Sequence, residues 1–254
     1  MIKHELNAIA NAFAFFSRIP VPQWVTFGAD AQQHASRYFP LVGWVLAGLL
    51  ALLWYVGSFL WPTLVVVILV MAAGVWLTGG FHEDGFADCC DGFGGGYHKD
   101  QILTIMKDSR LGTYGVLGSI LLILLKLALL SQLSWTALLI SYPFSRVMPV
   151  WMMALMTYAR VDGSGKAGGV SRGINGLDVG IATVTGLLSY LLLPSFDVAF
   201  VSCMIGVPVG ITYLFSRYLQ RQIGGFTGDC LGAAQQLAEV SIYLVLGAQW
   251  HSFG

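Results

Sequence analysis

The sequence predicts an all-α protein, a polytopic integral membrane helical bundle of about seven transmembrane helices with an N-terminal interfacial helix. Apolar residues make up 56% of the 254 residues and charged residues only 10%. A soluble domain carries about 25% charged residues, because its surface faces water. The apolar residues are also grouped into seven segments separated by short turns. Thirteen basic residues balance thirteen acidic ones, so the charge does not indicate a nucleic-acid partner.

The first element lies within residues 1–37, the N-terminal cytoplasmic or interfacial segment. Its apolar residues recur at helical spacing on one face, namely Ile2, Leu6, Ile9, Phe13 and Phe16. This pattern favours a short helix lying in the membrane interface. Asn7 and Asn11 interrupt the apolar run, which argues against a cleavable signal. An ordinary first transmembrane span is the alternative.

Each of the seven apolar segments that follow is a candidate transmembrane helix: 38–57, 62–80, 114–130, 134–156, 178–193, 197–215 and 232–248. A span needs about 20 mainly apolar residues, so the third and the fifth are short. Lys126, near the end of the third segment, is expected to extend toward the membrane interface. The short connections predict antiparallel helix pairs.

The basic residues predict the orientation in the membrane. Eleven of the thirteen fall in the N-terminus and in residues 81–113, 157–177 and 216–231. With seven spans, these four regions lie on one face. Short loops rich in Lys and Arg stay in the cytoplasm, so we expect the N-terminus and these loops there.

Residues 81–113 are predicted to form a cytoplasmic acidic active-site loop. Asp84, Asp88 and Asp91 are spaced i, i+4, i+7, so on a helix their carboxylates share one face. Such carboxylates repel one another unless a cation neutralises them, and hard oxygen ligands are those that Mg²⁺ prefers. We therefore expect a Mg²⁺ site that also binds phosphate. A solvated acidic loop is the alternative.

Two neighbours of this cluster, Glu83 and His82, each have two possible roles. Glu83 points away from the three-Asp face, yet a bend at the helix end would bring it to a second metal ion. His82 is either a ligand or proton carrier, because its side chain titrates near neutral pH, or an ordinary interface residue.

Basic residues beside glycines are candidates for holding phosphate oxygens. Lys107 and Arg110 precede the third apolar segment, where anchoring at the membrane surface is the alternative role. Lys166 and Arg172 lie in or beside a glycine-rich loop, residues 163–169. That loop does not match a P-loop, because Ala167 stands where Ser or Thr is required.

A second glycine-rich segment, Gly224-Gly225-Phe226-Thr227-Gly228-Asp229, opens the last apolar segment. A helix start of this kind offers free N–H groups to an anion, and Asp229 would reach a metal ion or act as a base. The alternative is that Asp229 caps the helix. Arg146 and Glu239 lie inside apolar segments, so they are either functional or a buried structural pair.

At these residues the sequence resembles the cobalamin synthase family, the adenosylcobinamide-GDP ribazoletransferases. The stretch from His82 to Gly92 is similar to the family's H-x-D-G-x-A-D-x-x-D-G signature. Lys107-Asp108-Ser109-Arg110, Gly225-Phe226-Thr227-Gly228-Asp229 and the N-terminal Arg18-Ile19-Pro20 also fit. Cys89-Cys90 depart from the pattern, since the family more often has small or hydroxyl residues there.

The resemblance implies a multi-pass enzyme of the bacterial inner membrane that completes cobalamin with Mg²⁺ as its cofactor. In that step α-ribazole, or its 5′-phosphate, displaces GMP from adenosylcobinamide-GDP. Residues 1–254 are expected to form a single catalytic domain. The predicted catalytic residues are His82, Asp84, Asp88, Asp91 and Asp229, and the predicted metal ligands are Glu83 and the same four aspartates. The predicted substrate-binding residues are Lys107, Asp108, Arg110, Arg146, Lys166, Arg172, Gly225, Thr227 and Gly228.

Several alternatives stay open at this point. The general base, the acceptor's phosphorylation state, and a homo-oligomer or a complex with other late cobalamin-pathway enzymes are not decided by these residues. A rival function is another membrane transferase that uses diphosphates, of the CDP-alcohol phosphotransferase or prenyltransferase type. The CDP-alcohol enzymes need a D-x₂-D-G-x₂-A-R motif, which the sequence lacks. A cation transporter would place its acids deep within the spans.

Overall fold

The computed structural model describes residues 2–28, 34–160 and 174–248, and within these ranges helices joined by turns form the fold. The elements are α1 (Ile2–Phe16), η1 (Ala35–Tyr38), α3 (Phe39–Gly57), α4 (Thr63–Thr78), α5 (Phe81–Gly95), α6 (Lys99–Ile105), α7 (Thr113–Leu130), α8 (Thr136–Ser145), α9 (Val147–Leu155), α11 (Gly176–Leu187), η2 (Leu188–Leu192), α12 (Val198–Gln222) and α13 (Gly228–Gly247). The described ranges contain no strand, and extended pairing is limited to an isolated bridge between Tyr158 and Phe226.

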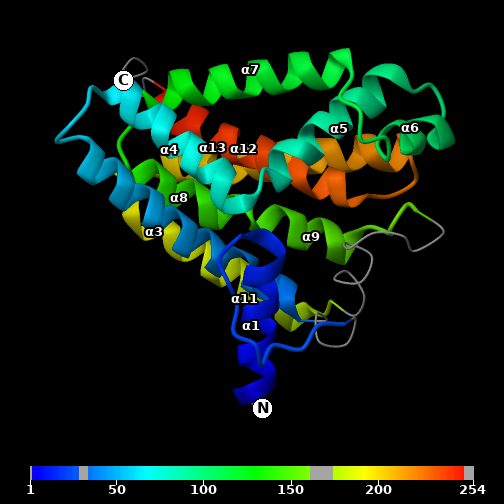
Figure 1. The fold of residues 1–254 in the computed structure, drawn as a ribbon, viewed down its shortest axis with the longest axis horizontal. Coiled ribbons are helices and arrows are strands. Elements are labelled where there is room, and N and C mark those ends of the chain that lie inside the picture. Colours follow the sequence, from blue (N-terminus) through cyan, green and yellow to red (C-terminus); the bar gives the residue numbers. More distant parts are fainter. Residues whose placement is uncertain (1, 29–33, 161–173, 249–254) are drawn as a thin grey trace.

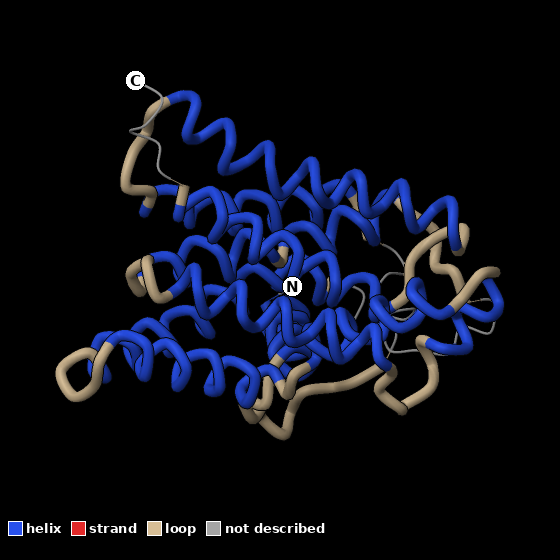
Figure 2. The backbone as a smooth tube through the Cα atoms, turned by 90° about the horizontal axis from the view of Figure 1, so that it is seen from above, coloured by secondary structure: helices blue, strands red, loops and turns tan. Residues whose placement is uncertain are grey.

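The long helices lie side by side and run between two ends of the bundle (Figures 1 and 2). The α5–α6–α7 connection, the end of α9 and the α12–α13 turn lie at one end, and the α3–α4 and α7–α8 turns lie at the other (Figure 1). The described parts of three predicted basic regions, 81–113, 157–177 and 216–231, therefore gather at the same end. This arrangement agrees with the charge pattern of the sequence.

All seven predicted apolar segments form helices, which confirms the all-α membrane fold class. Five helical stretches of the described chain are long and apolar enough to cross a bilayer: Ala35–Gly57, Thr113–Leu130, Thr136–Leu155, Val198–Gln222 and Gly228–Gly247. The pair α4 and α5 makes a sixth if it is counted as one span, although the two helices are bent by 88°. The stretch Gly176–Leu192 is shorter. The predicted count of seven transmembrane helices is therefore not confirmed.

The described helices differ in how much apolar surface they expose. On α7 and α12 only 22% of the most apolar window is buried, whereas on α13 the share is 78%. α13 packs against α5, α7, α8, α9 and α12, so it forms the centre of the bundle. A bilayer would cover the exposed apolar side chains on the outer helices, as expected for an integral membrane protein.

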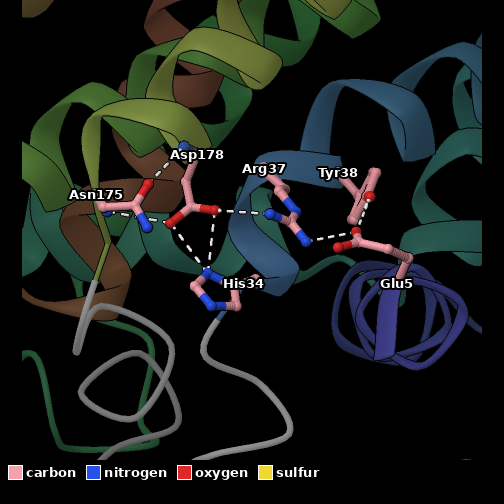
Figure 3. A network of polar contacts seen from close by, with 6 residues as sticks. All are labelled: Glu5, His34, Arg37, Tyr38, Asn175 and Asp178. Atoms are coloured by element: carbon pink, nitrogen blue, oxygen red, sulfur yellow. Dashed lines mark hydrogen bonds and ion pairs between the residues drawn. The ribbon is translucent and has the colours of Figure 1, made fainter. Parts of the chain in front are cut away.

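The N-terminal helix α1 forms as predicted and is held to the bundle by a polar network (Figure 3). Arg37 joins Glu5 of α1 to Asp178 of α11, and its Nη1 lies 3.3 Å from the Asp178 carboxylate. His34 Nδ1 lies 3.1 Å from the same carboxylate. Asn175 completes a capping box with Asp178, which is fully buried. The network thus joins three segments that are far apart in the sequence.

The corner between α4 and α5 sets the direction of the acidic segment. Gly79 and Gly80 both adopt left-handed backbone angles, with φ of 72° and 71°. Glycine adopts this conformation without steric cost, so the chain turns sharply between the two helices. The predicted acidic loop at residues 81–113 contains the helices α5 and α6, and its three helically spaced aspartates lie on α5. α5 forms because it packs against α13 and α7.

Two glycines of α3 offer a test of the helix packing. A methyl group at Gly43 would lie 2.6 Å from the carbonyl oxygen of Tyr142 in α8, whereas one at Gly48 would meet no described atom within 4 Å. We expect Gly43→Ala to destabilise the protein by about 1–3 kcal/mol through overpacking. Gly48→Ala should be neutral or stabilise by up to about 1 kcal/mol. Thermal unfolding in detergent measures both, and equal midpoints for the two variants would contradict the packing.

Candidate active site

A close contact between α5 and α13 brings the acidic residues together. A methyl group at Gly85 would lie 2.8 Å from the carbonyl oxygen of Asp229, and one at Gly232 would lie 3.2 Å from that of His82. A side chain at Gly85 would clash with the Asp229 backbone and one at Gly232 would be tightly packed, so the two glycines let the helix backbones approach closely. The contact places Asp84 and Asp88 of α5 beside Asp229 at the start of α13.

The three carboxylates form a concentration of negative charge. Asp84 is exposed and Asp88 is half-buried. α5 is not one of the five helical stretches that are long and apolar enough to cross a bilayer. Its acidic face lies at the basic end of the bundle. Burial, followed by the charges of Asp229 and Asp84, raises the pKa of Asp88 to about 7. The cluster therefore favours a bound proton or cation.

A cation from another segment reaches this cluster. Arg160 Nη2 lies 2.9 Å from Asp229 Oδ2, and both side chains are largely buried. Extended pairing of two segments aligns them, because Ala159 N donates to Phe226 O at 2.9 Å and Phe226 N donates to Thr157 O at 3.0 Å. The sequence pattern did not single out Arg160, since its partner lies 69 residues away.

The glycine-rich segment 224–229 supports this arrangement. A methyl group at Gly225 would lie 2.1 Å from Thr157 O, so only glycine permits the pairing. Thr227 is the N-cap of α13: its side chain accepts from Cys230 N, and its hydroxyl donates to Asp229 Oδ2 at 3.2 Å. Asp229 is thus not the cap, and its carboxylate points to Arg160. Gly228 lines a small apolar cavity beside His82.

The fourth predicted aspartate is already engaged with the backbone. Asp91 is buried, and its two carboxylate oxygens accept the N–H groups of Gly112 at 2.7 Å and Gly115 at 2.8 Å. These groups lie at the start of α7, where free N–H groups need acceptors. Asp91 therefore joins α5 to the N-terminus of α7.

His82 and Glu83 face the interior of the protein. The His82 ring is buried and stacks on Phe16 at a centroid distance of 5.4 Å. Glu83 Oε1 accepts from Gln236 Nε2 of α13 at 3.1 Å. The structure therefore brings Asp84, Asp88 and Asp229 together, and it places His82 and Glu83 behind them.

Two open clefts flank the carboxylates, one near each end of α5. The cleft beside α6 has a volume of about 610 Å³, and its charged lining residues are Lys99, Asp100, Lys107, Asp108 and Arg160. The cleft at the α4–α5 corner measures about 650 Å³ and is lined by Asp84 and Glu83. Each cleft is large enough for part of a substrate to enter.

The predicted substrate-binding residues near α6 differ in their surroundings. Lys107 lines the first cleft, and its role in phosphate binding stays a prediction. Arg110 is strongly exposed and holds Asp108 through contacts of 2.6–3.1 Å, and this pairing lowers the pKa of the Asp108 carboxyl. Lys166 and Arg172 lie outside the described residues.

The donor set fits Mg²⁺, which prefers hard oxygen ligands. Among the described residues, no three His, Cys, Asp or Glu side chains form a ready group of metal ligands. Mg²⁺ is commonly held by one or two carboxylates, with water and substrate phosphate completing its coordination. Asp84, Asp88 and Asp229 can supply these carboxylates.

The charges inside the bundle are arranged differently from the expectation. Lys126 does not extend toward the interface: it is buried, and its Nζ lies 2.8 Å from Glu239 Oε1. Arg146 does not pair directly with Glu239. Its Nη1 donates to Tyr142 O at 2.8 Å, and its guanidinium lies 4.9 Å from the centre of the Tyr142 ring. Lys126 can point into the bundle because its ammonium pairs there with the Glu239 carboxylate.

A chain of hydrogen bonds connects this ion pair to the acidic helix. Gln235 Nε2 donates to Glu239 at 2.7 Å, and Gln236 Nε2 donates to Gln235 at 3.0 Å and to Glu83 at 3.1 Å. The network therefore runs from α7 through α13 to α5, behind the carboxylate cluster.

Comparison with known proteins decides the family. The model of the cobalamin-5-phosphate synthase family matches residues 8–247. The chain belongs to the cobalamin-5-phosphate synthase family. This assignment confirms the resemblance seen in the acidic and glycine-rich motifs.

Relatives of this chain are similar to it along nearly its whole length. The Vibrio cholerae relative is 39% identical over 251 residues, which cover 97% of this chain and 95% of the relative. The Shewanella oneidensis relative is 43% identical, with 95% and 94% covered, and the Leptothrix cholodnii relative is 38% identical, with 95% of each chain covered. All three are named adenosylcobinamide-GDP ribazoletransferase. No solved structure matches this chain.

The buried ion pair predicts non-additive stability changes. Lys126→Met leaves Glu239 without its close cation, and loss of one partner of a buried pair costs about 3–5 kcal/mol. Adding Glu239→Gln removes the orphaned charge and keeps groups that can pair with Gln235 and Tyr243. We therefore expect the double variant to unfold at a higher temperature in detergent than Lys126→Met alone. A double variant destabilised by the sum of both single changes would contradict the pairing.

Proposed function

We propose that this protein catalyses the final assembly step of cobalamin, as an adenosylcobinamide-GDP ribazoletransferase. The acceptor is α-ribazole or its 5′-phosphate, and GMP is the leaving group. The observation that carries the proposal is the match to relatives of this name along nearly the whole chain. The acidic cluster at the basic end of the bundle supports it, because phosphoryl transfer needs positioning and neutralisation of charge.

In the proposed reaction, a hydroxyl oxygen of the acceptor ribose bonds to the phosphorus attached to cobinamide. The bond between this phosphorus and the oxygen of GMP breaks, and a carboxylate of the cluster takes the hydroxyl proton. Asp84, Asp88 and Asp229 are proposed to hold Mg²⁺, which would neutralise the diphosphate when bound. Asp91, Glu83 and His82 are proposed to support these carboxylates from behind.

The cleft beside α6 is proposed to bind phosphate oxygens of a substrate. Lys99, Lys107 and Arg160 line it, and Arg160 also fixes the Asp229 carboxylate. Arginine suits both contacts, because its planar guanidinium carries several donors. Arg160 therefore connects phosphate binding to the carboxylate cluster.

The test is transfer by the purified full-length protein in detergent. Adenosylcobinamide-GDP and α-ribazole should yield GMP and the corrinoid product with Mg²⁺, and EDTA should stop the reaction. Asp84→Asn and Asp88→Asn should each lower turnover about 100-fold or more, because each removes a carboxylate charge proposed to hold Mg²⁺. Asp84→Asn should keep the wild-type unfolding temperature.

Asp91→Asn is the matched comparison. It should lower activity and unfolding temperature together, because Asp91 caps the start of α7. Absence of GMP release by the wild-type protein would refute the proposed function. Normal turnover by both Asp84→Asn and Asp88→Asn would refute the assignment of the carboxylates.

We also propose that the protein lies in the bacterial inner membrane with its basic end in the cytoplasm. Tyr97, in the α5–α6 connection, is 84% exposed, and Phe59, in the α3–α4 turn, is 71% exposed. In a variant without the native cysteines, Phe59→Cys should react with a membrane-impermeant maleimide in intact spheroplasts. Tyr97→Cys should react only after lysis. The reverse pattern would invert the orientation.

A further inference from the structure

The cleft at the α4–α5 corner combines side chains of opposite charge from separate segments. Glu83 and Asp84 come from the first turn of α5. Arg18, which follows α1, lines the same cleft, as do the hydroxyl-bearing residues Thr78 of α4 and Ser119 of α7. The cleft is therefore built from four parts of the chain, and neither its cation nor its hydroxyls belong to the acidic motif.

A backbone hydrogen bond positions Arg18 at this corner. Arg18 N donates to Leu77 O near the end of α4 at 2.7 Å. Its side chain then passes over Gly79, where a methyl group would lie only 3.1 Å from Arg18 Nε. Gly79 thus has two roles, since it adopts a left-handed conformation and leaves room for the guanidinium.

Arg18, Glu83 and Asp84 line one cleft but are not neutralised as pairs with one another. Among the described residues, Arg18 forms no ion pair with Glu83 or Asp84, whereas Arg37, Arg110 and Arg160 each hold a carboxylate. A cleft with a separate cation and an exposed carboxylate suits a ligand that carries both signs. A diphosphate with a bound divalent cation has this character, because its oxygens accept from arginine while its metal binds carboxylate.

We propose that this corner cleft binds the diphosphate of the nucleoside-diphosphate-linked donor, with Arg18 as its phosphate-binding residue. The inference rests on the proposed function and assigns to it a residue outside the acidic and glycine-rich motifs. The cleft beside α6, with Lys99, Lys107 and Arg160, then serves the acceptor, and its cations would bind the phosphate of α-ribazole 5′-phosphate. The two clefts lie near opposite ends of α5, so donor and acceptor approach Asp88 and Asp229 from different directions.

The experiment measures binding of GDP with Mg²⁺ to the full-length protein in phosphatidylcholine nanodiscs, by equilibrium dialysis. Arg18→Gln should raise the Kd about tenfold or more, because it removes a charged hydrogen-bond donor. Arg18→Lys should lie between wild type and Arg18→Gln, since lysine keeps the charge without the planar fork. Arg221→Gln, an exposed arginine near the end of α12 in neither cleft, should leave the Kd unchanged.

The outcomes separate this inference from the proposed function. A wild-type protein that releases GMP while Arg18→Gln binds GDP normally would refute the cleft assignment alone. If Arg18→Gln instead loses only the thermal stabilisation given by phosphatidylglycerol nanodiscs, Arg18 binds a lipid headgroup and the assignment is wrong. Should Arg18→Gln fail to fold, an unchanged Kd in Arg18→Lys would also refute it. Transfer assays should show a higher KM for the donor in Arg18→Gln, with a smaller effect on kcat.

Discussion

The candidate site depends on the backbone contact between α5 and α13. Gly85 and Gly232 allow the helices to approach until a methyl group would meet a carbonyl at 2.8 or 3.2 Å. This contact brings a carboxylate near the end of the chain beside two carboxylates that lie about 140 residues earlier. Larger side chains at these positions would push the helices apart and increase the distance between their carboxylates. The glycines therefore affect the site by setting this distance.

An ion pair buried in the bundle lies behind this contact and helps to orient the acidic helix. Isolated charges are costly in an apolar surrounding. Lys126 and Glu239 lie in the bundle as an ion pair, with Nζ 2.8 Å from Oε1. Gln235 and Gln236 extend the pair to Glu83 on the acidic helix. A buried network of this kind favours one arrangement of the helices, because a displaced helix would leave several polar groups without hydrogen-bond partners. It therefore fixes the rotation of α5, and with it the direction in which Asp84 and Asp88 point.

Local patterns in the sequence predicted the features that depend on neighbours along the chain. The i, i+4, i+7 spacing gave a helix with Asp84 and Asp88 on one face, and the apolar segments gave the helices of the bundle. The same spacing could not separate Asp91 from the other two, because the backbone groups it binds lie 21 and 24 residues later. Lys126 was assigned to the interface for a similar reason: its partner lies on another helix. Arg160 had no local signal, since extended pairing across the fold brings it to Asp229.

Helix length explains why the predicted count of seven spans is not confirmed among the described residues. The predicted segment 62–80 ends at the corner formed by Gly79 and Gly80, where α4 and α5 meet at 88°, and α4 by itself has only 16 residues. The bend has a chemical consequence, because a straight continuation of α4 would carry the acidic residues along the membrane normal. Bent away, α5 lies across the start of α13 and exposes a cleft near each of its ends. The corner that ends α4 is thus the one that leaves two clefts beside the carboxylates, one for each substrate of the proposed reaction.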